Sequence, residues 1–375
     1  MPEGFMLFRR FGVGVLLILA AITILLWSDP KRLGLEKSAD NSVQIAVVTY
    51  ASVPVLEEGV EGLLAGLKDS GFDEGESCQI RIFNAENDRT TAALIAKEVV
   101  GDTFDLVTTI STPTLQAVAA ANVETEINHV FTLTTDPWGA GIGVSRDNPD
   151  DHPPYMTGYG SLQPVEALFR LALVANPNLK RVGVVWNPSE ANSESSTLAA
   201  RVACEKLNIE LIEATVDSSS GVVEAVNSLI SRDVEAIWSG GDSTVAAARD
   251  SMIGATSNAG IPVFTNIPND VQQGALFCLG ADYYQVAYAG GLLAARVLKG
   301  ESPKDIPVEN VVPELLALNY QVQPIYSKNW TFVDDWKTRA EMTIDADGSL
   351  NVTRKVLPKV GGEGEGESEV GGEGD

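Results

Sequence analysis

The chain has 375 residues, of which 45% are hydrophobic and 21% are charged, and its formal net charge is −25. This length supplies enough apolar side chains for two hydrophobic cores, so we expect two domains. The acidic balance argues against nucleic acid as a partner, because phosphate contacts need clustered lysines and arginines, which no segment supplies.

The N-terminal residues 1–42 contain an uncharged apolar run, residues 11–27, with basic residues on both sides. As a helix this run would span roughly 25 Å, which is short but sufficient for a membrane. No small-residue cleavage site follows it, and no cysteine at its end could carry a lipid. We therefore predict a cytoplasmic stub, a single uncleaved transmembrane signal anchor and a linker, with the rest of the chain on the periplasmic, extracytoplasmic side.

Residues 43–160 alternate apolar strands with helices, which predicts a first α/β lobe with a doubly wound parallel sheet. Ligands of such sheets bind at the carboxyl ends of the strands. Hydroxyls at the start of a helix there favour an anion. The polar residues that end these strands are Tyr50, Ser52, Ser111, Thr112, Thr135 and Asp136. The Pro/Asp-rich run 145–160 reads as a surface insertion before the chain crosses to a second lobe.

Residues 161–279 repeat the pattern of the first lobe in the same order, with strands 182–186, 210–213, 235–239 and 262–266. Between the third and fourth of these we expect one helix over residues 243–258. A repeat of this kind predicts two similar lobes joined by a hinge. The polar strand ends here are Asn187, Glu190, Asn192, Asp242, Ser243 and Asn266. Donors in one lobe and carboxylates in the other suit a zwitterion such as an amino acid.

The C-terminal third continues with an amphipathic helix, and we expect residues 280–302 to return to the first lobe. Residues 303–360 are expected to pack on the second lobe and form an extension. Its turn at residues 345–349 resembles a calcium loop but lacks the required Gly and Glu, so we interpret it as a hairpin turn. Residues 361–375 alternate Gly with Glu and predict a disordered tail.

Cysteine and histidine usage excludes several kinds of site. Cys78, Cys204 and Cys278 have no zinc or redox spacing and are expected to be buried thiols. The chain has two histidines, His129 and His152, which makes a His-based metal site or catalytic triad improbable. We expect no metal and no cofactor.

The motifs STPTLQA, TTDPWGAG, VVWNPSEANS, GGDSTV, IPVFTN and GALFCLGADYYQVAYAGGLLAARVLKGESPKDIPVE resemble the bacterial ABC-transporter substrate-binding proteins whose characterised relatives bind aromatic amino acids such as tryptophan. The resemblance covers roughly residues 43–309 in continuous order. It implies the type I periplasmic-binding fold, with a ligand held between two closing lobes and delivered to a permease driven by a separate ATPase. At matching positions it implies ligand contacts by Tyr50, Ser111, Thr112, Asp136, Asn187, Asn192, Asp242, Ser243, Asn266 and Asp282.

Three functions fit these observations, and the first is favoured. The first is a non-catalytic binding protein for import of an amino-acid-like solute. The second is the ligand-sensing domain of a membrane signalling system, although no kinase or second transmembrane segment follows. The third is an enzyme such as a racemase or lyase. An enzyme needs a matched acid and base, and the predicted cleft offers Asp136, Glu190 and Asp242 without a positioned Cys, His or Lys.

Overall fold

The structure, a computed structural model, describes residues 42–101 and 103–353. The predicted signal anchor and the predicted acidic tail lie outside these residues. Within the described ranges, no helix combines the length and the apolar character needed to cross a membrane.

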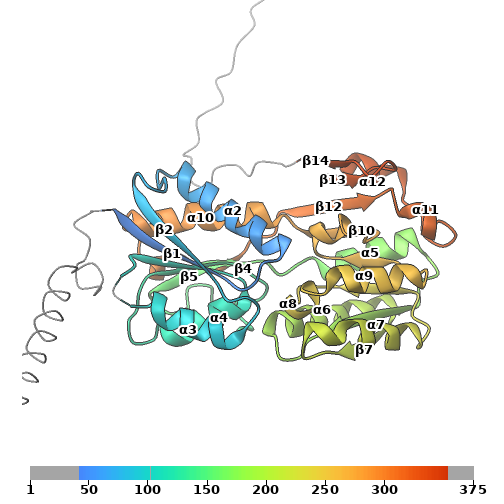
Figure 1. The fold of residues 1–375 in the computed structure, drawn as a ribbon, viewed down its shortest axis with the longest axis horizontal. Helices are drawn as coiled ribbons and strands as arrows, with labels where there is room; N and C mark the ends of the chain where they lie inside the picture. Colours follow the sequence, from blue (N-terminus) through green and yellow to red (C-terminus); the bar gives the residue numbers. More distant parts are fainter. Residues whose placement is uncertain (1–41, 102, 354–375) are drawn as a thin grey trace, which may run out of the picture. The chain divides into compact units, whose positions relative to one another are not determined.

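Lobe 1 is a sheet with the strand order β11-β5-β4-β3-β1-β2, and the pairs β1–β3, β3–β4, β4–β5 and β5–β11 are parallel. Helices α2 and α10 lie on one side of it and helices α3 and α4 on the other (Figure 1). The elements are β1 (Val43–Thr49), α2 (Pro54–Asp69), β2 (Cys78–Asn84), α3 (Arg89–Val99), β3 (Leu106–Ile110), α4 (Thr112–Ala121), β4 (His129–Thr134), β5 (Met156–Gly160), α10 (Tyr283–Leu298), η4 (Pro303–Asp305) and β11 (Glu309–Asn310).

Lobe 2 is a second sheet with the strand order β14-β13-β12-β10-β9-β8-β6-β7. Its strands β7, β6, β8, β9 and β10 pair in parallel, and β12 joins them antiparallel to β10. The elements are α5 (Val165–Ala175), β6 (Arg181–Trp186), α6 (Ala191–Leu207), β7 (Glu210–Thr215), η2 (Ser219–Gly221), α7 (Val222–Ile230), β8 (Ala236–Ser239), α8 (Ser243–Ala246), α9 (Arg249–Asn258), β9 (Val263–Thr265), η3 (Pro268–Val271), β10 (Phe277–Ala281), β12 (Glu314–Asn319), α11 (Gln323–Tyr326), α12 (Asp334–Arg339), β13 (Met342–Ile344) and β14 (Leu350–Val352). The prediction of two similar α/β lobes built on parallel sheets is confirmed.

Two predicted segments were wrong. Residues 156–160 do not belong to a surface insertion but form the buried strand β5, which pairs with β4. Its sequence MTGYG lacks the β-branched run that marks the other strands, and Gly158 allows close packing, since a Cβ there would lie 2.2 Å from the carbonyl oxygen of Phe131. The predicted helix 243–258 is interrupted at Ala247 and Ala248, which separates α8 from α9. No Gly or Pro stands at this break to indicate it in the sequence.

The C-terminal segment divides between the lobes, in contrast to the prediction that residues 303–360 pack on lobe 2. Strand β11 pairs with β5 in the sheet of lobe 1, whereas β12, β13 and β14 extend the sheet of lobe 2. The turn at residues 345–349 closes the β13–β14 hairpin through a hydrogen bond of 2.9 Å from the Asp345 amide to the Ser349 carbonyl, as predicted. Among the described residues, no group of three His, Cys, Asp or Glu side chains could hold a metal ion.

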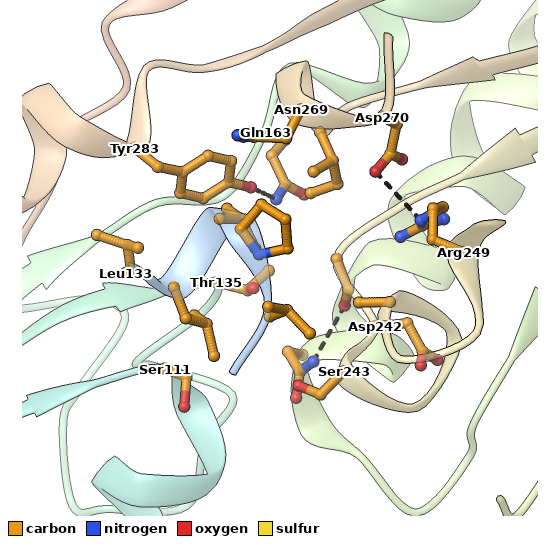
Figure 2. A pocket seen from close by; sticks show the side chains of 18 of the residues that line it. Ser111, Leu133, Thr135, Gln163, Asp242, Ser243, Arg249, Asn269, Asp270 and Tyr283 are labelled. Atoms are coloured by element: carbon orange, nitrogen blue, oxygen red, sulfur yellow. Dashed lines mark hydrogen bonds and ion pairs between the residues drawn. The ribbon is translucent and has the colours of Figure 1, made fainter. Parts of the chain in front are cut away.

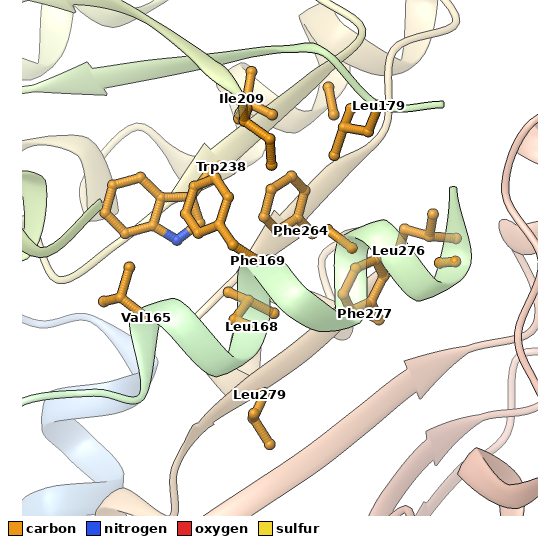
Figure 3. Close-up of a cluster of buried hydrophobic side chains, with 14 of the residues drawn as sticks. Val165, Leu168, Phe169, Leu179, Ile209, Trp238, Phe264, Leu276, Phe277 and Leu279 are labelled. Atoms are coloured by element: carbon orange, nitrogen blue, oxygen red, sulfur yellow. The ribbon is translucent and has the colours of Figure 1, made fainter. Parts of the chain in front are cut away.

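An aromatic core fills lobe 2 between α5 and the sheet. Figure 3 shows Phe169 of α5 beside Trp238 and Phe264 of the sheet, with ring centroids 5.6 Å and 5.3 Å apart. Phe277 stacks on Phe264, and Trp336 of α12 packs on Phe277 at 5.7 Å. The extension therefore contributes a large side chain to the core of lobe 2.

Candidate functional site

A cavity lies where strand ends of both lobes face each other (Figure 2). From lobe 1 it is lined by the start of α2, by the end of β4, by residues that follow β3 and β4, and by the first residue of α10. From lobe 2 it is lined by residues that follow β6, β8 and β9. This is the carboxyl edge of both parallel sheets, where α/β proteins bind ligands. The cavity volume is about 80 Å³, several times the roughly 10–15 Å³ that one water molecule needs. The cavity therefore has room for a small solute.

One wall of the cavity is apolar. The N-cap and first turn of α2 supply Val53, Pro54, Val55 and Leu56, with Pro54 at a first-turn position where its missing N–H costs no helical hydrogen bond. Leu133 and Ile267 continue this wall from β4 and from the residue before η3. An apolar part of a ligand can pack here without losing hydrogen bonds to water.

Ser111 and Thr112 bring hydroxyls to the cavity from the start of α4. Ser111 has a φ of 97°, a left-handed conformation that is costly for a residue with a side chain. Its Oγ lies 3.2 Å from Thr114 Oγ1, and Thr112 Oγ1 accepts a hydrogen bond of 3.3 Å from the Thr135 amide. Each hydroxyl oxygen thus has a partner within lobe 1, but Thr112 only accepts there and keeps its O–H as a donor.

Asp242 is a buried carboxylate that lines the cavity from lobe 2. It caps α8 by accepting a hydrogen bond of 2.7 Å from the Val245 amide, and it also accepts from the Asn187 amide at 2.7 Å and from Ser193 Oγ at 2.5 Å. Burial and, secondly, the nearby charge of Glu190 raise the pKa of Asp242 to about 6, while these three donors oppose the shift. The carboxylate therefore joins the β6–α6 loop to the start of α8.

Glu190 lies beside Asp242 and joins the same two loops. It accepts hydrogen bonds from the amides of Ser243 and Thr244 at 2.9 Å and 3.0 Å, and one of 2.6 Å from Thr244 Oγ1. Asn192 Nδ2 donates to it at 3.0 Å. With its oxygens engaged in this way, Glu190 supports the loops behind the cavity.

Arg249 and Asp270 form a buried ion pair at the cavity, with 3.1 Å between Arg249 Nε and Asp270 Oδ1. Arg249 also donates to Ser239 Oγ, and Asp270 accepts a hydrogen bond of 2.7 Å from Thr265 Oγ1. Figure 2 shows the two charged side chains pointing toward each other. The sequence analysis did not predict this ion pair. The predicted continuous helix 243–258 placed Arg249 in the middle of a helix, away from the strand ends.

Gln163 and Tyr283 meet on the opposite part of the cavity, where Gln163 Nε2 donates to the Tyr283 hydroxyl (Figure 2). Gln163 lies on the crossing between the lobes, and Tyr283 begins α10, the helix that returns to lobe 1. Burial raises the pKa of the Tyr283 hydroxyl, which keeps it protonated. Gln163 follows β5, which the sequence did not predict as a strand, and Tyr283 follows β10, which lies after the last strand matched between the two repeats, so the strand-end argument did not include them.

The structure places the predicted site residues in two groups. Those that line the cavity are Ser111, Thr112, Thr135, Asn192, Asp242 and Ser243. Those that do not line it are Tyr50, Ser52, Asp136, Asn187, Glu190, Asn266 and Asp282. A strand end brings several side chains to the same edge, but successive side chains point in different directions, so only some of them reach the cavity.

The predicted residues outside the cavity have other partners. Ser52 accepts a hydrogen bond of 2.8 Å from Asn84 Nδ2 on the far side of the β1 end. Asn266 Oδ1 accepts from Trp238 Nε1 at 2.9 Å within the core of lobe 2, and Asp282 caps α10. Asn187 and Glu190 take part in the loop network described above. These contacts fix loops and helix ends.

Asp136 and Tyr50 lie near contacts between the lobes. Asp136 pairs with Arg146 at 2.7 Å and accepts a hydrogen bond of 3.2 Å from Ser195 Oγ of lobe 2. The Tyr50 hydroxyl is buried, which raises its pKa, and the Glu190 charge of lobe 2 raises it further. In this arrangement the two lobes touch beside the cavity, and Asp136 is one of the groups that join them.

Comparison with known proteins places this architecture among transport proteins. A family model described as "ABC transporter substrate binding protein" matches residues 44–324. A curated relative, the tyrosine-binding protein of Clostridioides difficile (strain R20291), is 30% identical over 286 residues, which cover 76% of this chain and 81% of the relative.

Solved structures agree with this match. A conserved domain protein from Vibrio cholerae is 33% identical with a TM-score of 0.75, covering 81% of this chain and 100% of that one. A ligand-free, open substrate-binding protein with adhesive properties from Clostridium difficile is 27% identical with a TM-score of 0.59, covering 78% and 99%. A domain from Streptococcus pneumonia in complex with L-Trp, 24% identical with a TM-score of 0.75 and covering 81% and 100%, shares the fold.

Proposed function

Because the chain belongs to the ABC transporter substrate-binding protein family, we propose that it binds a small amino-acid-like solute between its two lobes. It delivers this solute to a membrane permease driven by a separate ATPase, and it works without catalysis. The two-lobed part acts on the extracytoplasmic side, and the predicted anchor at residues 11–27 would hold it at the membrane.

The observation that carries this proposal is the lining of the cavity. One side is aliphatic and receives an apolar side chain, while Asp242 and the Arg249–Asp270 ion pair bring buried charges of both signs. Charged groups buried away from water need partners of opposite charge. A zwitterion with an apolar side chain supplies both charges and the apolar part. The tyrosine-binding relative and the structure in complex with L-Trp support the same ligand class.

The absence of catalysis is proposed from the cavity chemistry. Among the described residues that line the cavity there is no Cys, His or Lys. Asp242 is held by three donors and Asp270 by Arg249, so neither carboxylate is arranged as a free acid or base beside a nucleophile. We therefore expect the bound solute to be released unchanged.

A thermal-shift screen of the full-length chain against the amino acids and related acids tests the proposal. Saturating ligand at about 100 times Kd adds roughly 2.7 kcal/mol of stability, so L-tyrosine, L-tryptophan or a similar solute should raise Tm by several degrees. Mass spectrometry should recover that solute unchanged after prolonged incubation. A screen with no shift for any compound, or with conversion of the best ligand, contradicts the proposal.

A matched pair of variants assigns the shift to the cavity. Ala246→Phe fills space in the cavity and should abolish the shift, because Ala246 lines the cavity. Leu198→Phe on the exposed face of α6, where Leu198 is 56% exposed, should leave it unchanged. Equal shifts in both variants would place the binding site elsewhere.

A further inference from the structure

The guanidinium of Arg249 has an unused hydrogen-bond donor. Arg249 is 3% exposed, its Nη1 donates to Ser239 Oγ, and its Nε faces Asp270. Nε, although 3.1 Å from Asp270 Oδ1, and Nη2 are both buried and make no hydrogen bond within the described part of the chain, and Nη2 also has no ion-pair partner there. Leaving a buried charged donor unpaired costs about 1–3 kcal/mol or more, and Arg249 lines the cavity. A ligand with an acceptor at this position would remove that cost.

Asn192 presents the complementary acceptor. Its Nδ2 donates to Glu190 Oε2 at 3.0 Å and to the Gly241 carbonyl at 3.1 Å. These two acceptors fix the orientation of the amide, since a flipped amide would place its oxygen against both of them. Its Oδ1 is buried and has no partner among the described residues, and Asn192 lines the cavity near Asp242. A hydrogen-bond donor of the ligand in this part of the cavity would therefore pair with Asn192 Oδ1.

We propose, on the basis of the function proposed above, that Arg249 binds the ligand's carboxylate and that Asn192 Oδ1 and the Asp242 carboxylate bind its ammonium group. Asp270 is a positioning residue that holds the guanidinium through Nε and leaves Nη2 for the ligand. This arrangement fixes the α-amino acid end of the solute in lobe 2. The side chain is then directed toward the aliphatic wall supplied mainly by lobe 1.

The start of α4 is the competing place for a carboxylate, and the sequence favoured it. Its two cavity-facing hydroxyls, on Ser111 and Thr112, are neutral donors, and Ser111 Oγ already lies 3.2 Å from Thr114 Oγ1. Arg249 has both a full positive charge and an unpaired donor, and hydrogen bonds to a charged group contribute about 1.5–3 kcal/mol against 0.5–1.5 for neutral ones. The balance of charge and unpaired atoms favours Arg249.

The test measures discrimination between L-tyrosine and L-tyrosinamide, which lacks the carboxylate, by calorimetry on the full-length chain. L-Tryptophan and its amide serve as a second pair. The wild type should prefer each acid over its amide. Arg249→Gln should reduce that preference about 10- to 100-fold, the equivalent of one charged hydrogen bond, by weakening the acid while leaving amide binding nearly unchanged. Arg249→Lys, which keeps the charge but not the planar donors, should fall between them.

Control variants separate a binding role from a folding role. Arg249→Gln leaves Asp270 buried without its partner, so the double variant Arg249→Gln/Asp270→Asn provides the same measurement if the single variant fails to fold. Arg201→Gln removes another Arg–carboxylate pair of lobe 2, with Glu213, outside the cavity and should keep the wild-type preference. Asn192→Ala should instead weaken L-tyrosine relative to 3-(4-hydroxyphenyl)propionate, which lacks the ammonium group.

The outcomes are distinct. An unchanged preference for acid over amide in Arg249→Gln overturns the assignment of the carboxylate, and a loss of preference in Ser111→Ala would then move it to the start of α4. In that case the proposed function stands. If the wild type binds none of the amino acids, the proposed function and this assignment both fail.

Discussion

Burial shifts the pKa of Asp242 and of His129 in opposite senses, because it disfavours the charged form of each. Asp242 beside the cavity has its pKa raised to about 6. His129 at the start of β4 is fully buried, its Nε2 lies 2.8 Å from Thr109 Oγ1, and its pKa is lowered from 6.5 to about 3. The lowered pKa of His129 predicts a dependence of stability on pH that a single substitution can test.

His129 should make the fold sensitive to mild acid. Its pKa is lower in the folded state, so as pH falls below 6.5 the unfolded state takes up the proton first and the free energy of unfolding decreases. Between pH 7 and pH 5 this costs about 2 kcal/mol at one histidine. His129→Gln keeps a donor near Thr109 and does not titrate, so it should lose about 2 kcal/mol less than the wild type over that interval.

Urea unfolding at the two pH values measures this difference. Asp242 contributes the opposite trend, since its raised pKa favours the folded state as pH falls, but it does so equally in both proteins and cancels in the comparison. His152→Gln, in the loop before β5, serves as the matched control. If the free energy of unfolding changes equally with pH in His129→Gln and in the wild type, the lowered pKa of His129 is contradicted.

The crossing of α2 and α10 depends on glycine at the scale of the element. A Cβ at Gly62 would lie 2.3 Å from the Tyr284 carbonyl oxygen, one at Gly66 would lie 2.3 Å from that of Tyr288, and one at Gly291 would lie 2.2 Å from that of Leu63. All three obstacles are backbone atoms, which cannot move aside as a flexible side chain can. The two helices therefore pack backbone against backbone and hold the returning chain on lobe 1.

Gly66→Ala should destabilise the protein by about 1–3 kcal/mol, the usual effect of overpacking, despite the better helix propensity of alanine. Gly254→Ala on α9 is the matched control, because a Cβ there meets nothing within 4 Å. It should stabilise the protein by roughly 0.5–1 kcal/mol. Urea unfolding curves measure both, and a stabilising Gly66→Ala would show that the helices separate easily.

At the scale of the whole molecule, the extension beyond the family match is part of lobe 2. The family model ends at residue 324, yet Trp330 and Trp336 are each 2% exposed, and both contact Phe277. Strands β13 and β14, which also lie beyond residue 324, lengthen the sheet. The added residues therefore complete a core that the matched segment leaves open.

Trp336→Ala should cost about 3–5 kcal/mol of stability, as expected when a buried aromatic side chain is removed. Ile325→Ala in the same extension should change stability by less than about 0.5 kcal/mol, because Ile325 is 61% exposed. Calorimetric unfolding of both variants provides the comparison. A small effect of Trp336→Ala would mean that the extension only covers lobe 2 and does not stabilise it.

The cavity and the fold differ in how far the sequence predicted them. The two lobes followed from a repeated alternation of apolar strands and helices. The strand-end argument also named Ser111, Thr112 and Asp242, which line the cavity. It missed Arg249 and Tyr283, because their positions depend on where a helix breaks and on which lobe a helix returns to. Whether the lining residues contact a ligand stays a prediction.

The sequence by itself determined the lobes, their order and the edge at which a site forms, because strand periodicity and polar strand ends are local properties of the chain. Only the tertiary structure decided which of these polar side chains face the cavity and which hold loops together. The physical reason is that a side chain's direction and its partners come from residues distant in sequence. Asn192 between Glu190 and Gly241, and Arg249 between Ser239 and Asp270, are the two cases on which the ligand assignment depends.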